Sequence, residues 1–299
     1  MATLRDIRRR ISGVKSTQKI TKAMKMVAAA KLRRAQEAML SARPYSRKMK
    51  ELLQQLSTTV DVSKYPLFEQ RSVSKAAVIV VTADRGLCGA FNSNIIKTAV
   101  SHVKSEFPDL FTRGDVKLIV VGKKASDYFG KRDYSVAKSH VGIFSGLQFA
   151  TARNIMSDAI NGFLEKRYDR VDVVFNEFKS LGQQRVRIEQ LLPIATQSDS
   201  QGNAPAKQPA PVDYIYEPSS DAIITSLVPK HLDFQMWRIL LESNASEQGA
   251  RMTAMENATT NATDLIRTLQ LSYNKARQSS ITKELLEIVA GAEALKKAG

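Results

Sequence analysis

The sequence has few of the features that mark a secreted, disulfide-bonded or membrane-spanning chain. Its 299 residues include one cysteine, Cys88. A single cysteine excludes an intrachain disulfide and is typical of a reducing compartment. No run of 18 apolar residues occurs, so we predict no direct membrane insertion. The N-terminus lacks the apolar core of a signal peptide, and we expect it to belong to the mature protein.

Proline is absent from residues 230–297, and Gly249 and Gly291 are the only glycines there. Such a stretch predicts a helix about 100 Å long, too long to fold into a globule alone. Apolar residues spaced four and three apart indicate a narrow coiled-coil seam. They form two sets, the second out of phase with the first: Ala262, Ile266, Leu269, Tyr273 and Ala276, then Ile281, Leu285, Ile288, Ala292 and Leu295. We expect this helix to lie against a partner helix, to enter another protein, or both.

Acidic residues are scarce at the other end of the chain. The net charge is +16, and residues 1–56 hold 15 Lys and Arg against three acidic residues. Residues 4–56 read as a helix that Pro44 should kink or end. Its apolar residues form a stripe whose phase is expected to slip between Val14 and Ile20. The stripe consists of Leu4, Ile7, Ile11 and Val14 before the slip, and Ile20, Met24, Ala28, Leu32, Ala35 and Met39 after it.

The middle of the chain alternates between strand and helix patterns. Residues 76–82 and 116–121 are continuous apolar runs, as in strands buried on both faces. Helices are expected at 94–107, 123–129 and 148–168, and a strand pair at 171–179 and 185–192. This order predicts a mostly parallel α/β sheet with an antiparallel edge.

The fold class predicted from these patterns is α/β. A long antiparallel coiled coil of the N- and C-terminal helices is expected, with a Rossmann-like domain inserted between them. The expected ranges are 1–60 for the first helix, 75–195 for the α/β domain, 196–218 for a polar linker and ordered return, and 219–299 for the second helix. Ser219 or Ser220 can cap that helix, and Pro229 should kink it.

Catalytic chemistry finds no support in the sequence. The turn Asp84–Gly89 follows a strand but matches neither glycine-rich phosphate-binding pattern. The three histidines fall in different predicted elements, and Cys88 reads as a small buried thiol. Glu284 and Glu287 lie one helical turn apart and could suggest acid–base catalysis. With no cleft and no further group nearby in the pattern, we expect them to be surface carboxylates. We therefore predict no catalytic residue, no metal site and no cofactor.

The basic N-terminal helix leaves one alternative open. Clustered positive charge is the electrostatic footprint of phosphate binding, so a nucleic-acid-binding coiled coil is a second candidate. Residues 1–44 contain no aromatic side chain that could stack on bases. A solvated basic face, or a face that meets acidic protein loops, fits the apolar stripe better.

Four segments resemble the gamma subunit of the rotary ATP synthase. The most specific is Ile281–Ala294, where Ile281, Thr282, Glu284, Glu287, Gly291 and Ala292 fall at the family's spacing. The other three are Gln18–Lys31, Thr82–Gly89 and Ala245–Met252. The likeness thus extends from one end of the chain to the other.

This resemblance implies a non-catalytic central rotor. The terminal helices would turn inside a ring of alternating alpha and beta subunits. The α/β domain would lie near the epsilon subunit and the membrane c-ring. Rotation of the c-ring would drive each beta subunit through its conformational states, and nucleic acid would not be a partner.

The resemblance also assigns residues by position. Met24 would face an acidic loop of the beta subunits, with Lys22, Lys25 and Lys31 supplying positive charge. Residues at the C-terminal end would take part in coupling or ring contact: Arg251, Gln278, Thr282, Glu284 and Glu287. Tyr214 and Tyr216 would lie at the base of the stalk, near epsilon and the c-ring.

The expected location is the cytoplasmic face of a bacterial inner membrane, as a peripheral protein. The chain starts at Met1 and lacks the cysteine-bearing insert of chloroplast members. A processed mitochondrial form, on the matrix side of the inner membrane, is the alternative.

Overall fold

The structure is a computed structural model that describes residues 3–61, 64–180, 184–194, 217 and 219–298. The chain divides into two compact units: Ala29–Arg251, and Met1–Ala28 together with Met252–Gly299. Helices α1 (Leu4–Thr59) and α6 (Ser220–Ala298) each contribute to both.

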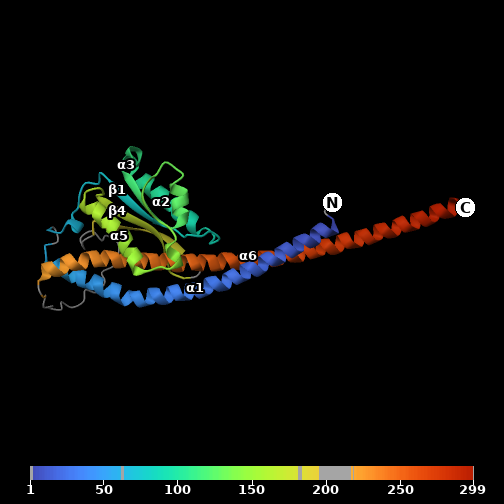
Figure 1. Ribbon diagram of the computed structural model, residues 1–299, viewed down its shortest axis with the longest axis horizontal. Helices are drawn as coiled ribbons and strands as arrows, with labels where there is room; N and C mark the ends of the chain where they lie inside the picture. Colours follow the sequence, from blue (N-terminus) through green and yellow to red (C-terminus); the bar gives the residue numbers. More distant parts are fainter. Residues whose placement is uncertain (1–2, 62–63, 181–183, 195–216, 218, 299) are drawn as a thin grey trace. The chain divides into compact units, whose positions relative to one another are not determined.

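A five-stranded sheet forms the centre of the larger unit (Figure 1). Its strands are β1 (Ala76–Val81), β2 (Val116–Val121), β3 (Ser135–His140), β4 (Arg170–Phe178) and β5 (Gln184–Leu192). The order is β3-β2-β1-β4-β5, and only the β4–β5 pair is antiparallel. The predicted α/β class, with a parallel sheet and an antiparallel edge, is confirmed. Strand β3 was not predicted.

Helices cover both faces of this sheet. They are α2 (Phe91–Glu106), α3 (Pro108–Arg113), α4 (Lys123–Phe129) and α5 (Phe149–Leu164), with short 3-10 turns η2 (Pro66–Phe68) and η3 (Ile143–Ser145). Side chains of β1 alternate between two cores, which explains its continuous apolar run. Ile79 points into the core shared with α5 and α6, and Val78 into the core shared with α2 and α4.

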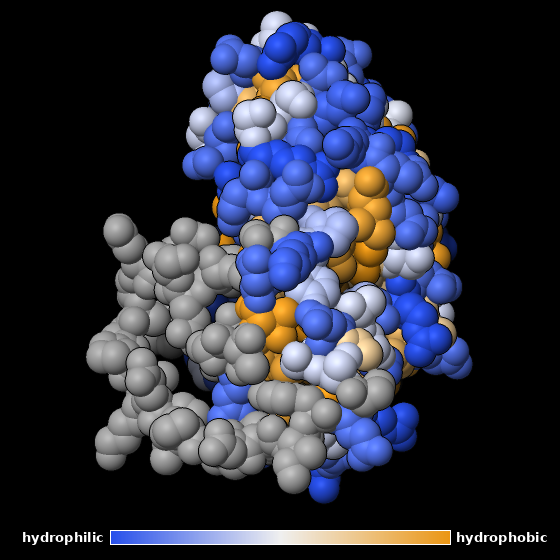
Figure 2. All heavy atoms as spheres, turned by 90° about the vertical axis from the view of Figure 1, so that its left-hand side faces the viewer, coloured by the Kyte–Doolittle hydropathy of each residue, from blue (hydrophilic) through white to orange (hydrophobic). Residues whose placement is uncertain are grey.

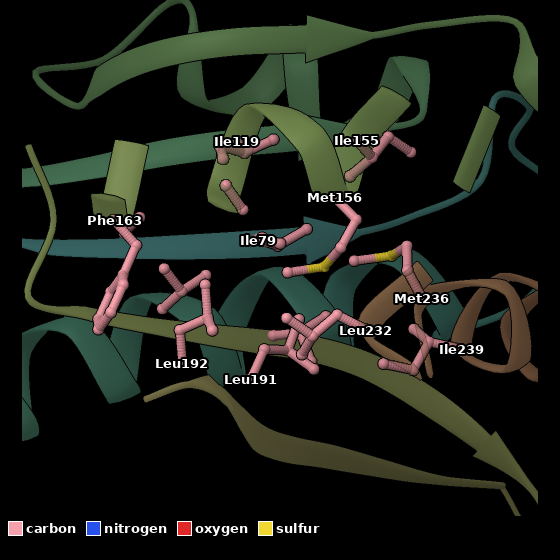
Figure 3. Packing of buried hydrophobic residues seen from close by; sticks show 14 of the residues in the cluster. Ile79, Ile119, Ile155, Met156, Phe163, Leu191, Leu192, Leu232, Met236 and Ile239 are labelled. Carbon is pink, nitrogen blue, oxygen red and sulfur yellow. The ribbon is translucent and has the colours of Figure 1, made fainter. Parts of the chain in front are cut away.

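The first part of α6 belongs to the core on the α5 side. Figure 3 shows Leu232, Met236 and Ile239 reaching toward Met156 of α5 and Leu191 of β5. All five side chains are at most 2% exposed. Figure 2 shows the face where α6 begins: hydrophilic side chains cover most of it, and apolar ones appear in separate patches. The first part of α6 is therefore built into the core of this unit.

In the smaller unit, α1 and α6 lie side by side in opposite directions. Three polar pairs cross between them: Gln18 with Thr263 (2.7 Å), Thr21 with Thr259 (2.8 Å) and Lys25 with Glu256 (2.6 Å). Continuing this register places Leu4 opposite Ala276. The antiparallel pairing predicted for the chain ends is confirmed in this unit.

The seam on α6 agrees with the prediction, but the seam on α1 does not. Ala262 and Ile266 are 7% and 8% exposed. On α1, Ile20 is 60% exposed and lies outside the seam, so its predicted place there is wrong. The predicted phase slip is wrong too, because polar residues continue the regular spacing after Val14. The less exposed row is Leu4, Ile7, Ile11, Val14, Gln18, Thr21, Lys25 and Ala28.

Neither proline of the long helices ends its helix. Helix α1 continues past Pro44 to Thr59, and α6 contains Pro229. A proline removes one backbone hydrogen bond, and the many bonds on both sides keep these helices continuous. The predicted cap is confirmed: the Ala222 N–H donates to Ser219 Oγ at 3.2 Å.

Candidate functional site

The carboxyl ends of the parallel strands are where α/β folds usually bind a ligand. Here the chain's own polar groups bond to one another at that edge. The Asp84 carboxylate accepts from the backbone N–H groups of Lys123 (3.0 Å), Gly142 (2.8 Å) and Phe144 (3.2 Å). Thr82 Oγ1 accepts from the Ala125 N–H at 2.8 Å. The turn that follows β1 therefore ties three connections together.

Gly122, which has no side chain, allows the connection after β2 to approach the end of β1 closely. Its φ is +89°, in the region that favours glycine, and an added Cβ would lie 2.1 Å from the Thr82 carbonyl oxygen. No other residue type fits that contact without moving the end of β1.

Arg251 joins this turn to helix α6. Its guanidinium donates to the Gly86 carbonyl at 2.6 Å and pairs with Glu247 one turn earlier on the helix. The Arg251 and Glu247 side chains are 12% and 7% exposed. Two segments that resemble the family, Thr82–Gly89 and Ala245–Met252, are thus brought together inside this unit. No pattern of residues along the chain predicts that contact.

Cys88 lies in the same turn and is buried. Burial raises the pKa of its thiol, and the Glu247 carboxylate raises it further. The Asn92 amide donates to the sulfur at 3.1 Å. A protonated, buried thiol is a poor nucleophile, in agreement with the structural role predicted for Cys88.

Charged residues buried elsewhere in the larger unit also pair with one another. Asp172, fully buried on β4, bonds His102 at 2.8 Å and Arg170 at 2.9 Å. Arg238 of α6 bonds Glu189 of β5 at 2.6 Å and Glu242 at 3.2 Å. Burial raises the pKa of Glu242, and Arg238 offsets only part of that effect. These groups hold helices to strands and do not converge on a cleft.

Sequence reasoning missed these networks because the partners lie far apart along the chain. A charged residue inside an apolar run, such as Asp172 in strand β4, is the one sequence feature that could have indicated a buried ion pair. Among the described residues, no cluster of three potential metal ligands occurs. In that part of the chain, no helix carries an apolar stretch able to cross a bilayer.

The residues assigned to partner contact on the N-terminal helix differ in exposure and in their bonds. Lys22 is exposed, and Met24 is half-buried beside the seam. Lys25 instead pairs with Glu256 across the seam, with the two side chains 37% and 54% exposed. One of the cations expected to face an acidic partner thus has a partner within the chain.

Of the five residues assigned to the C-terminal end, all but Arg251 lie on an exposed stretch of α6: Gln278, Thr282, Glu284 and Glu287. Their bonds in the described structure are local: Thr282 donates to the Gln278 carbonyl at 3.0 Å, and Ser280 to Glu284 at 3.4 Å. Glu287 lies 3.6 Å from Lys283. Tyr214 and Tyr216 fall outside the described residues, so their expected role at the stalk base stays a prediction.

Comparison with known proteins identifies the family. A family model described as ATP synthase matches residues 3–295. The ATP synthase gamma chain of Chlorobaculum parvum is 53% identical over 298 residues, covering 99% of this chain and 100% of that one. The gamma chain of Chlorobium chlorochromatii is 54% identical over 296 residues, covering 99% of each. This chain belongs to the ATP synthase gamma chain family.

Solved structures of ATP synthase share the fold. A chain in the central stalk and c-ring structure from Tetrahymena thermophila mitochondria has a TM-score of 0.60 and 26% identity, covering 80% of this chain and 99% of that one. A chain in the Euglena gracilis mitochondrial enzyme has a TM-score of 0.67 and 22% identity, covering 98% and 94%. The resemblance seen in the sequence is confirmed, and the nucleic-acid-binding alternative has no support among these relatives.

The close contact at Gly122 predicts a large effect of one methyl group. Gly122→Ala should lower the free energy of unfolding by at least about 3 kcal/mol, because it adds a collision with Thr82 to the strain of a positive φ. Gly142→Ala is the control: φ is +81° there, but an added Cβ would meet no neighbouring side chain or backbone within 4 Å, so only about 1 kcal/mol is expected. Urea unfolding measures both, and equal costs would contradict the close contact.

The Arg251–Glu247 pair predicts strong coupling between two substitutions. Arg251→Ala should cost about 3 kcal/mol, because it leaves a buried carboxylate without its cation. The double variant with Glu247→Ala should cost at least about 1 kcal/mol less than the sum of the single variants. Arg167 and Glu165, 2.7 Å apart but more than half exposed, provide a control pair with little coupling. Additive costs at Arg251 and Glu247 in urea unfolding would refute the pairing.

Proposed function

We propose that this chain is the central rotor shaft of an ATP synthase. In this role it couples proton-driven rotation of the c-ring to the conformational cycling of the catalytic beta subunits, and it performs no catalysis itself. The observation that carries the proposal, beside the family membership, is the exposed apolar end of α6. A helix end of this kind requires a partner from another chain.

That end, residues 278–298, extends beyond the register of α1 in the smaller unit. Its large apolar side chains are between 49% and 68% exposed: Ile281, Leu285, Leu286, Ile288 and Val289. Spaced three and four apart, they form adjacent rows over about half of the helix circumference. An apolar sleeve made by the alpha and beta subunits would cover such a surface and still let it turn.

The N-terminal helix presents a different surface. Its arginine and lysine side chains are exposed: Arg5, Arg8, Arg9, Arg10, Lys15, Lys19 and Lys22. Positive charge of this density favours encounters with acidic loops and fixes their register more than it adds affinity. A partner that contacts α1 therefore meets a basic surface, and one that contacts the end of α6 meets an apolar one.

This asymmetry supplies the means of coupling. Around the paired stretch, a ring subunit that meets the basic α1 side at one angle and the α6 side at another is stabilised in different conformations. The shaft can change the populations only through that difference in contact free energy. Each proton that crosses at 100 mV delivers about 2.3 kcal/mol to the rotation.

The remaining partners and the location belong to the same proposal. The epsilon subunit and the c-ring would contact the larger unit, with Tyr214 and Tyr216 at the stalk base. Gln278, Thr282, Glu284 and Glu287 would meet the ring. The chain would be peripheral, on the cytoplasmic face of a bacterial inner membrane or, as the alternative, in a mitochondrion.

The test replaces two apolar side chains of the exposed end. Leu285→Asn together with Ile288→Asn should leave the unfolding midpoint of the free chain nearly unchanged, because both side chains are already exposed. In membrane vesicles that carry the complete reconstituted enzyme, with alpha and beta subunits and the c-ring, proton pumping per ATP hydrolysed should fall at least about tenfold, since buried unpaired amides are costly.

Leu164→Asn is the matched control, because Leu164 is a leucine 45% exposed on α5. That variant should pump normally. Normal pumping by the double variant would contradict the proposed sleeve contact. Salt-sensitive DNA binding without recovery of alpha and beta subunits would favour the nucleic-acid alternative.

A further inference from the structure

The seam of the smaller unit buries polar residues where apolar ones were available. Hydrophobic periodicity favours turning Ile20 and Met24 toward α6. The structure instead buries Thr21, at 8% exposure, and leaves Ile20 60% exposed, whereas Lys25 and Met24 are both half-buried at the seam. Some other interaction therefore determines how α1 is rotated about its axis here.

The cross-helix pairs supply that interaction. The hydroxyl oxygens of Thr21 and Thr259 lie 2.8 Å apart, and each hydroxyl is also within hydrogen-bond distance of a backbone carbonyl of its own helix. The Lys25 ammonium lies 2.6 Å from the Glu256 carboxylate. A rotation of α1 by one residue would turn Lys25 away from Glu256 and Thr21 away from Thr259. Polar groups at seam positions of coiled coils commonly fix alignment in this way, at some cost in stability.

The rotation that these pairs select has a consequence on the outer surface. Ile20, Met24 and Val27 are spaced four and three apart, so they form a row about a quarter turn from the seam. Ile20 and Val27 are 60% and 57% exposed. The row on the other flank carries Lys15, Lys19 and Lys22, and it continues to Met26, which is 61% exposed. The same pairs therefore decide which flank is apolar and which is basic.

We infer that Lys25 and Glu256, with the Thr21–Thr259 and Gln18–Thr263 pairs, are positioning residues. They hold the exposed side chains of Ile20 and Val27 outward for the alpha and beta subunits, with half-buried Met24 between them at the edge of the seam. Lys25 acts through Glu256 and does not itself contact an acidic loop. The positioning is a property of the free chain. Its use by a partner rests on the proposed rotor function.

Exchanging the charges separates positioning from direct contact. Lys25→Glu and Glu256→Lys each place like charges opposite one another, and the double variant restores an opposite pair with reversed polarity. Val27→Cys reports on the apolar row, because its labelling by a soluble maleimide depends on exposure. The chain without this substitution gives the background from buried Cys88.

In the purified full chain, each single reversal should slow labelling at position 27 by about threefold to tenfold, as Ile20 and position 27 turn inward. The double variant should label at nearly the original rate. Unchanged labelling in the single variants would overturn the inference, and so would faster labelling, which indicates that the helix frays without rotating.

The same variants in the reconstituted enzyme test how the row is used. Coupled pumping should fall in both single variants and return in the double variant, although position 25 then carries a negative charge. If Lys25 contacted an acidic loop directly, the double variant would stay defective, and the inference would be wrong. Failure of the unsubstituted chain to assemble would count against the rotor function alone, because the labelling result still decides the positioning.

Discussion

The structure depends on one constraint: in the smaller unit, α6 supplies more helix than α1 can cover. Helix α1 contributes residues up to Ala28, and its register on α6 ends near Ala276. The following residues of α6 keep an apolar pattern with no helix of the same unit opposite them. Burial of such side chains is the main source of stability for a helix in water. This end of α6 therefore depends on other chains, and a rotor shaft is the function of this family that requires it.

In the larger unit, by contrast, many polar and charged groups find their partners within the unit itself. Its polar groups at the strand ends and its buried charges bond to one another, from Asp84 at the carboxyl edge to the Asp172 and Arg238 networks. Such networks stabilise a fold only when all members have partners, and they leave little capacity for a ligand. The nucleotide-binding architecture is present, but its usual site is used for internal connections. Fold and function separate here, as they do in many α/β domains.

The elements that are buried on both faces could be predicted from the sequence. The strands at 76–81 and 116–121 are buried on both faces and read as apolar runs. Strand β3 was missed because it lies at the sheet edge with mostly exposed side chains, so no such run marks it. Ile20 was misplaced for a related reason: periodicity counts apolar residues, whereas paired hydroxyls and an ion pair occupy the seam. Contacts such as Arg251 with Gly86 join segments distant in sequence, and one chain's pattern does not reveal them.

Hydrogen exchange along α6 tests the central claim most directly. In the free full-length chain, backbone amides of residues 252–277 should be protected by pairing with α1, and those of residues 278–298 should exchange much faster. Assembly with alpha and beta subunits should slow exchange in residues 278–298 by at least about tenfold, because the sleeve then covers them. Equal protection of the two stretches in the free chain, or no change on assembly, would contradict the account.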